Sequence, residues 1–301
     1  MVIEPVAVAP TPSPTPTPTP SPQTGTVSVT TDILYGQGAT TAGSIDLFVD
    51  VYQPSETCDA NRPVVLFLHG GGYVSGDKQS DDVTELADAM NARGLAFVSI
   101  QYRLQADDAV VSAEADAFLR ESLEDSDLVV PDVLNTTIIA SVEDTLLALN
   151  FLEDNQDTYC LDTSRIAYTG SSAGTITVLQ VAYSLEDFTT DFPQPTVVAD
   201  LWGDLPIDED LDPGEAPFIV VHGTDDPLVP YQAALDLTAQ ADVVGVPFAL
   251  YSVQGAGHSF SGTNFFETEF EGETLSNITA DFVEDHLTGE APVYGRFDVQ
   301  P

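Results

Sequence analysis

Short runs of apolar residues alternate along the chain with longer segments in which apolar and polar positions follow a helical repeat. The runs Pro63–Leu68 and Leu95–Ile100 are continuous, as is typical of strands buried on both faces of a sheet. Segments such as Ser80–Arg93 and Thr137–Leu152 have the apolar spacing or the end signals of helices. Strands that alternate with helices predict an α/β fold, with a mostly parallel sheet of about eight strands covered by helices on both faces.

The same alternation continues as far as residue 287. Further strands are predicted at 26–33 and 44–52 (a hairpin-like pair with one wet face), 166–169, 196–201, 217–221 and 247–253, and further helices at 173–185, 230–240 and 275–286. Two acidic insertions, 105–135 and 186–216, interrupt the alternation and are expected at the carboxyl edge of the sheet, where ligands bind. They predict either a lid or substrate wall, or solvent-exposed loops. We therefore predict one domain over residues 26–287, followed by a tail, residues 288–301, without a predicted element.

The charge of the chain is strongly one-sided. It has 49 Asp and Glu against 7 Lys and Arg, a net charge of −42, and Lys78 is its only lysine. Such a chain repels phosphates, which argues against nucleic acid and anionic membrane surfaces as partners. The acidity could select a cationic substrate, or it could keep a protein soluble after export into saline water. The scattered positions of the acids favour the second interpretation.

The N-terminal residues 1–25 predict a linker. Proline occupies every second position over residues 10–22, which forbids a helix and favours an extended spacer. Met1–Pro5 has neither a basic start nor a long apolar core, so it is not a signal peptide. We expect that a signal or lipid-anchor segment was removed, and that this bacterial protein is secreted or tethered to the cell surface. No run in the sequence approaches the length of a transmembrane helix.

The sequence Gly170-Ser171-Ser172-Ala173-Gly174 lies between a β-prone run and an apolar run that can form a helix. This is the pattern of a nucleophile elbow, in which a sharp turn from strand to helix exposes the central serine. Ser172 would then project above the sheet at the positive end of the following helix. A Gly/Ser loop without a catalytic role is the alternative.

A second glycine motif, His69-Gly70-Gly71-Gly72-Tyr73, follows the buried strand that ends at Leu68. Consecutive glycines leave backbone N–H groups able to approach a ligand closely. In acyl transfer such donors stabilise the oxyanion of the tetrahedral intermediate, by about 3–4 kcal/mol each. Gly71, Gly72 and Ala173 are the candidate donors; a flexible turn is the alternative.

A serine nucleophile needs a base, and the chain has only four histidines. His69 belongs to the glycine motif, His222 ends an apolar strand, and His286 lies late in a helix. His258, in a glycine-rich loop after the last predicted strand, is therefore the candidate base. Thr224-Asp225-Asp226-Pro227 precedes it and supplies the acid that orients the imidazole, with Asp226 preferred over Asp225; helix capping is the alternative role for either.

These motifs resemble those of α/β-hydrolase esterases and lipases, in particular bacterial carboxylesterases that include feruloyl and acetyl-xylan esterase-like members. The similar segments are Leu68–Tyr73, Gln101–Leu104, Gly170–Gly174, His222–Pro230 and Gly257–Ser259. The resemblance implies a serine carboxylic-ester hydrolase with Ser172, His258 and Asp226 as its triad, Tyr73 and Ser171 against the substrate, and no metal or organic cofactor. The aspartate before Pro-Leu is the triad acid in that family, which matches Asp226.

The chain departs from hormone-sensitive-lipase-like enzymes in two ways. Ser171 occupies a position that is often acidic there, and 26–62 is too short and strand-like for a helical cap. We therefore expect an open site, or one roofed by the two insertions. A small-molecule or polymer-borne ester is the expected substrate, including plant polysaccharide esters or synthetic polyesters. A serine peptidase of the same fold and a non-catalytic binding module remain alternatives, and the oligomeric state is not readable.

Cys58 and Cys160 are the only two cysteines. Without a Cys-x-x-Cys motif or a nearby histidine, a metal site is not indicated. In the usual strand order of this fold, both lie at the edge of the sheet opposite the active site. They predict a structural disulfide, which fits an oxidising compartment; two free buried thiols are the alternative.

Overall fold

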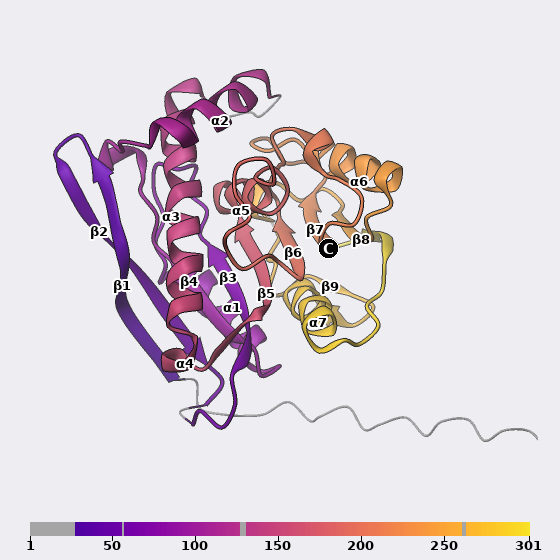
Figure 1. Ribbon diagram of the computed structural model, residues 1–301. Helices are drawn as coiled ribbons and strands as arrows, with labels where there is room; N and C mark the ends of the chain where they lie inside the picture. Colours follow the sequence, from indigo (N-terminus) through magenta and orange to yellow (C-terminus); the bar gives the residue numbers. More distant parts are fainter. Residues whose placement is uncertain (1–27, 56, 127–130, 261–262) are drawn as a thin grey trace, which may run out of the picture.

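The computed structural model describes residues 28–55, 57–126, 131–260 and 263–301. Nine strands form one sheet in the order β1-β2-β4-β3-β5-β6-β7-β8-β11 (Figure 1). β1 pairs with β2 and β2 with β4 in antiparallel register, and every later pair in the sheet is parallel. The predicted α/β fold with a mostly parallel sheet is therefore confirmed. The predicted linker, residues 1–25, lies outside the described residues.

The elements follow the predicted alternation closely. The strands of the sheet are β1 (Ser28–Thr40), β2 (Gly43–Gln53), β3 (Arg62–Leu68), β4 (Ala96–Ile100), β5 (Leu161–Ser171), β6 (Val197–Leu201), β7 (Phe218–Gly223), β8 (Phe248–Val253) and β11 (Gly295–Val299), with β9 (Glu269–Phe270) and β10 (Glu273–Thr274) as a separate pair. The helices are α1 (Asp81–Asn91), α2 (Ala113–Asp125), α3 (Asn135–Asp154), α4 (Gln156–Tyr159), α5 (Ala173–Tyr183), α6 (Gln232–Val244) and α7 (Leu275–Thr288).

The C-terminal segment, for which the sequence analysis predicts no element, contains a strand. Residues 295–299 form β11, which pairs in parallel with β8 at the edge of the sheet. Its exposure alternates, and Val299 is fully buried, so only one face of this short strand packs on the core. The segment 288–301 is therefore partly an edge strand of the domain rather than a tail outside it.

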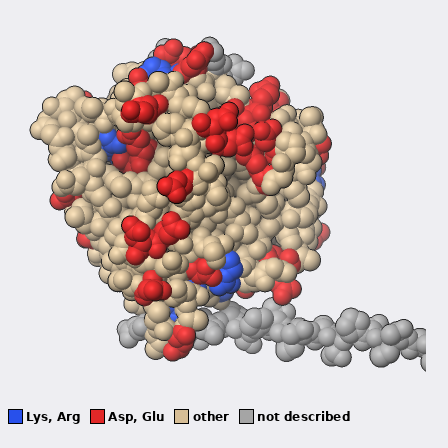
Figure 2. Space-filling view, in the orientation of Figure 1, with Lys and Arg blue, Asp and Glu red and all other residues tan. Residues whose placement is uncertain are grey.

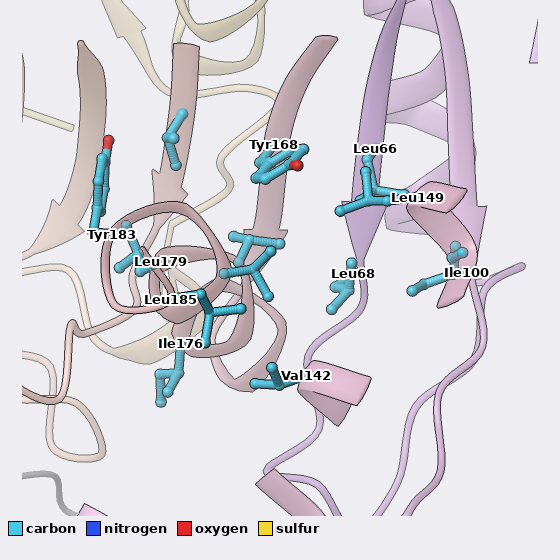
Figure 3. Packing of buried hydrophobic residues seen from close by; sticks show 14 of the residues in the cluster. Leu66, Leu68, Ile100, Val142, Leu149, Tyr168, Ile176, Leu179, Tyr183 and Leu185 are labelled. Atoms are coloured by element: carbon cyan, nitrogen blue, oxygen red, sulfur yellow. The ribbon is translucent and has the colours of Figure 1, made fainter. Parts of the chain in front are cut away.

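The sheet has an apolar core on each face because its parallel strands bury alternate residues on opposite sides. On one face α3 and α5 cover the central strands, and Figure 3 shows Leu149 of α3 beside Leu66 of β3, with Ile176 and Leu179 of α5 in the same cluster. On the other face α1 and α7 pack against β3 to β8. Both layers hold the carboxyl ends of the strands in place, and the loops that follow these ends carry the site described below.

The structure joins Cys58 and Cys160 by a disulfide with a Cα–Cα distance of 5.7 Å. It links the segment after β2 to the residue before β5, away from the carboxyl ends of the parallel strands. Acidic side chains lie over many elements of the face shown in Figure 2, and basic ones are few. Within the described residues, no helix has both the length and the apolar character needed to cross a membrane.

Candidate active site

Ser172 stands at the tight turn between β5 and α5. Its backbone has φ 52° and ψ −119°, a conformation that residues other than glycine rarely adopt. The turn is possible because the flanking residues lack side chains: a Cβ at Gly174 would lie 2.1 Å from the carbonyl oxygen of Leu68, and one at Gly170 would lie 2.5 Å from the carbonyl carbon of Gly174. The backbone N–H of Ser172 donates to the carbonyl of Leu201 at 2.9 Å, which fixes the turn against β6. This is the predicted nucleophile elbow geometry.

Three side chains from distant parts of the sequence form a continuous hydrogen-bonded row. The Oγ of Ser172 lies 2.8 Å from Nε2 of His258, and Nδ1 of His258 lies 2.7 Å from Oδ2 of Asp226. Since a carboxylate only accepts, Nδ1 carries the proton and Nε2 is the free acceptor for the serine hydroxyl. The structure thus brings together the three residues that the sequence predicts as a triad. Asp225 is not part of this row; its backbone N–H donates to the carbonyl of Ala256.

Asp226 is held as a charged acceptor. Burial raises the pKa of its carboxyl, but the nearby imidazole of His222 and the hydrogen bonds from His258 and the backbone N–H groups of Leu228 and Val229 outweigh burial, and the net pKa lies well below its ordinary value. The backbone groups donate to Oδ1 at 2.8 and 3.0 Å, which leaves Oδ2 for the imidazole of His258. The carboxylate is therefore both ionised and fixed in orientation.

His222 is a contributor that the sequence reasoning did not assign. Its side chain is fully buried at the end of β7, where Nε2 lies 3.0 Å from the carbonyl oxygen of Val229 and 3.5 Å from Oδ2 of Asp226. Burial lowers the pKa of this imidazole, yet the contact with Asp226 and the nearby charge of Asp200 raise it overall. No local pattern in the sequence indicates this contact, because it depends on the turn that follows β7.

The other two histidines lie outside the row. His69 stacks on Tyr102 with ring centroids 4.4 Å apart, and its Nδ1 contacts the carbonyl of Gly70. His286 contacts the carbonyl of Phe282 and the hydroxyl of Tyr294. Both therefore have local contacts outside the triad, and neither is the base, in agreement with the choice of His258.

The glycine loop after β3 has the conformation that the oxyanion interpretation requires. Gly71 and Gly72 have φ values of +118° and +62°, and a Cβ at Gly71 would lie 2.0 Å from the carbonyl oxygen of Ser75. Within the described part of the chain, the backbone N–H groups of these two glycines have no acceptor, and Ala173 is the first residue of α5, where an N–H has no partner in the helix. All three residues line the same cavity as Ser172.

Tyr73 and Ser171 differ in how they meet this cavity. Ser171 is half-buried in its wall, as expected for a residue facing the substrate. The side chain of Tyr73 is fully buried, and its hydroxyl lies 3.1 Å from that of Thr177 on α5. Tyr73 also lines the cavity, as predicted, but its hydroxyl anchors the glycine loop to the helix that follows the elbow and does not face the substrate.

The cavity beside Ser172 has a volume of about 550 Å³. Its apolar wall is formed by Leu134, Ile176 and Val229. Two of the lining residues, Pro131 and Leu134, come from the first insertion. That insertion thus contributes to the wall of the site. The segments 186–195 and 204–216 of the second insertion do not line the described cavities next to Ser172.

Comparison with known proteins agrees with this architecture. Residues 49–118 match the family model BD-FAE, which describes esterases of the α/β-hydrolase fold. A curated relative, the pyrethroid hydrolase Ces2a of Mus musculus, is 37% identical over 59 residues, which are 19% of this chain and 10% of that protein.

Solved structures resemble nearly the whole domain. A truncated carbohydrate esterase from gut microbiota superposes with a TM-score of 0.62 at 16% identity, over 90% of this chain and 99% of that one. The propionate-bound esterase Est2 of the planctomycete Thermogutta terrifontis has a TM-score of 0.61 at 16% identity, over 86% of this chain and 93% of that one. The solved structures show the α/β-hydrolase fold for this chain, and the family model that matches residues 49–118 is a model of esterases with that fold.

Proposed function

We propose that this protein is a secreted serine carboxylic-ester hydrolase that works through an acyl-enzyme intermediate. The observation that carries the proposal is the row of contacts from Ser172 Oγ through His258 to Asp226, at 2.8 and 2.7 Å. A serine in an elbow, a base on its hydroxyl and an ionised acid behind that base are what acyl transfer needs.

Each group in the row has a definite task. His258 takes the proton of Ser172 as the hydroxyl attacks the ester carbonyl, and then gives this proton to the leaving alcohol. The N–H groups of Gly71, Gly72 and Ala173 stabilise the oxyanion, and the ionised Asp226 stabilises the imidazolium. Water then attacks the acyl-enzyme through the same histidine and releases the acid.

Replacement of the nucleophile tests the proposal directly. Ser172→Ala is expected to lower kcat for p-nitrophenyl acetate by at least about a thousandfold, as removal of triad members does in other serine hydrolases. Far-ultraviolet circular dichroism and the thermal midpoint should match those of the wild type, because alanine fits the space of the serine. Retained turnover by the folded variant would contradict the proposal.

Two further measurements separate the competing functions. Matched ester and amide substrates with the same acyl group distinguish an esterase from a peptidase, and we expect kcat/KM to favour the ester. A fluorophosphonate probe distinguishes an enzyme from a binding module, because it reacts with an activated serine. The solved structure of T. terrifontis esterase 2 phosphonylated by cyclosarin is an example of phosphonylation in a protein of similar fold. A chain that stays unlabelled would be a binding module.

Export is supported by the disulfide between Cys58 and Cys160 and by the proline-rich segment 10–22. Fractionation of the source cells should find the protein in the medium or at the cell surface. Recovery of the reduced protein from the cytosolic fraction would contradict this part of the proposal.

A further inference from the structure

A second cavity adjoins the catalytic one. It has a volume of about 430 Å³ and shares Gly70, Gly71, Ser171 and Ser259 with the cavity beside Ser172. The acyl part and the alcohol part of an ester bound at Ser172 extend from the carbonyl carbon in different directions. The two cavities therefore offer separate places for these halves, and their walls differ in chemistry.

The second cavity has acidic side chains in its wall. Asp77 and Asp82 line it, both are exposed, and neither forms an ion pair in the described part of the chain. Among the residues that the structure describes, the only hydrogen bond to these carboxylates is a local one, from the backbone N–H of Gln79 to Oδ1 of Asp77. Two unpaired carboxylates make the wall attractive to a cation.

No basic side chain neutralises them. Lys78 follows Asp77 in the sequence, but its ammonium group lies 2.8 Å from Asp32 and 2.9 Å from Asp50, and its side chain is 7% exposed. The described lining of the cavity contains no Lys or Arg. His69 is its one imidazole, and burial lowers the pKa of His69, which keeps it neutral near pH 7.

Aromatic rings form another part of the wall. Trp202, Phe265 and Phe266 line the cavity, with Trp202 and Phe265 in edge-to-face contact at 5.5 Å and Phe265 and Phe266 at 5.1 Å. Trp202 is only 8% exposed, and its indole N–H has no hydrogen-bond partner in the described structure. Aromatic rings and carboxylates that line one cavity suit a quaternary ammonium group, because the ring quadrupole attracts a cation with little hydration.

We propose that this second cavity is a leaving-group subsite for esters of cationic alcohols, with Asp77, Asp82 and Trp202 as its recognition residues. The inference rests on the proposed esterase function and adds a substrate class to it. The apolar cavity, with Leu134, Ile176 and Val229, takes the acyl half. Selection for the cation is local, and therefore distinct from the general attraction exerted by a net charge of −42.

The test compares two esters that differ in charge alone. Acetylthiocholine and 3,3-dimethylbutyl thioacetate have the same acyl group and nearly the same shape, but only the first carries a quaternary ammonium group. For the wild type in 0.15 M salt, kcat/KM is expected to be about tenfold higher for the cationic ester. Asp77→Asn/Asp82→Asn should reduce this ratio to about one to three.

A matched control separates a local site from the field of the whole protein. Glu85→Gln/Asp88→Asn removes the same two charges from the exposed face of α1 without touching the cavity, so the ratio should stay within about twofold of the wild type. A ratio near one in the wild type would overturn the proposal, as would an equal loss in Glu85→Gln/Asp88→Asn and the cavity variant.

Failure of the subsite is distinguishable from failure of the esterase function. If the neutral thioester is not hydrolysed, the proposed function falls, and calorimetric titration of choline into the Ser172→Ala protein tests the cavity by itself. Binding of choline that is lost on adding Asp77→Asn/Asp82→Asn supports the subsite. An absence of binding, or binding that is equal in both proteins, overturns it.

Discussion

A buried ion pair behind the site allows a quantitative test of how the first insertion is anchored. Arg103 and Asp144 are 2% and 1% exposed, and Nη2 of Arg103 lies 2.8 Å from Oδ1 of Asp144. The guanidinium also donates to the carbonyls of Ala39 and Val110, and thereby joins β1, α3 and the start of the first insertion, residues 105–135. Arg103→Met removes these donors and leaves the carboxyl of Asp144 without its ion-pair partner, while the backbone N–H at position 103 still donates to Oδ2.

The cost should be large and should increase with pH. Removing one partner of a buried pair destabilises by about 3–5 kcal/mol. Burial raises the pKa of Asp144 from 3.8 to about 6 even with Arg103 in place. When the pKa of a carboxyl is higher in the folded than in the unfolded state, the protonated group stabilises the fold. This contribution is complete below the unfolded-state pKa and is lost as the pH rises to the folded-state pKa. In Arg103→Met the folded pKa rises further, so the loss continues above pH 6 at about 1.4 kcal/mol per pH unit.

Urea unfolding at pH 5, 6 and 7.5 measures this cost. The difference between wild type and Arg103→Met should grow by about 2 kcal/mol from pH 6 to pH 7.5. In the control Arg103→Met/Asp144→Asn the titrating carboxyl is gone, so this growth with pH should vanish. A cost of less than about 1 kcal/mol for Arg103→Met, or one that is constant with pH, would refute the reasoning.

Three further predictions concern the elbow, the triad support and the disulfide. Gly174→Ala places a Cβ 2.1 Å from the carbonyl oxygen of Leu68, so kcat for p-nitrophenyl acetate should fall by at least about tenfold; unchanged kinetics would show that the turn relaxes without cost. His222→Phe removes the donor to Val229 and the contact with Asp226, so kcat should fall by about tenfold with a smaller change in KM and a shifted pH–rate profile; an unchanged profile would leave His222 with packing alone. Cys58→Ser opens a disulfide that closes a loop of 102 residues, so unfolding free energy in urea should drop by about 2–5 kcal/mol, and a drop below about 1 kcal/mol would contradict this.

The sequence was most informative where one physical requirement dominates. Buried parallel strands need continuous apolar runs, so β3, β4 and β8 were predicted to within a residue or two. The elbow and the glycine loop were readable because only glycine avoids the backbone clashes found at Gly71 and Gly174.

Features set by tertiary contacts were not readable. β11 is short and buries one face, so Gly295–Val299 carries too little periodicity to stand out. His222 looked like the end of a strand, because its contact with Asp226 depends on the turn that follows β7. The second cavity is lined by Asp77, Trp202 and Phe265, which come from three separate loops. No local sequence pattern predicts that these residues lie together.

The location of a covalent adduct tests the central claim most directly, namely that His258 and Asp226 activate Ser172. We expect a fluorophosphonate probe to label the wild type on the peptide that contains Ser172, as located by mass spectrometry. Labelling should be absent in Ser172→Ala and at least about a hundredfold slower in His258→Ala. An adduct on another residue, or equal labelling rates in wild type and His258→Ala, would contradict the account.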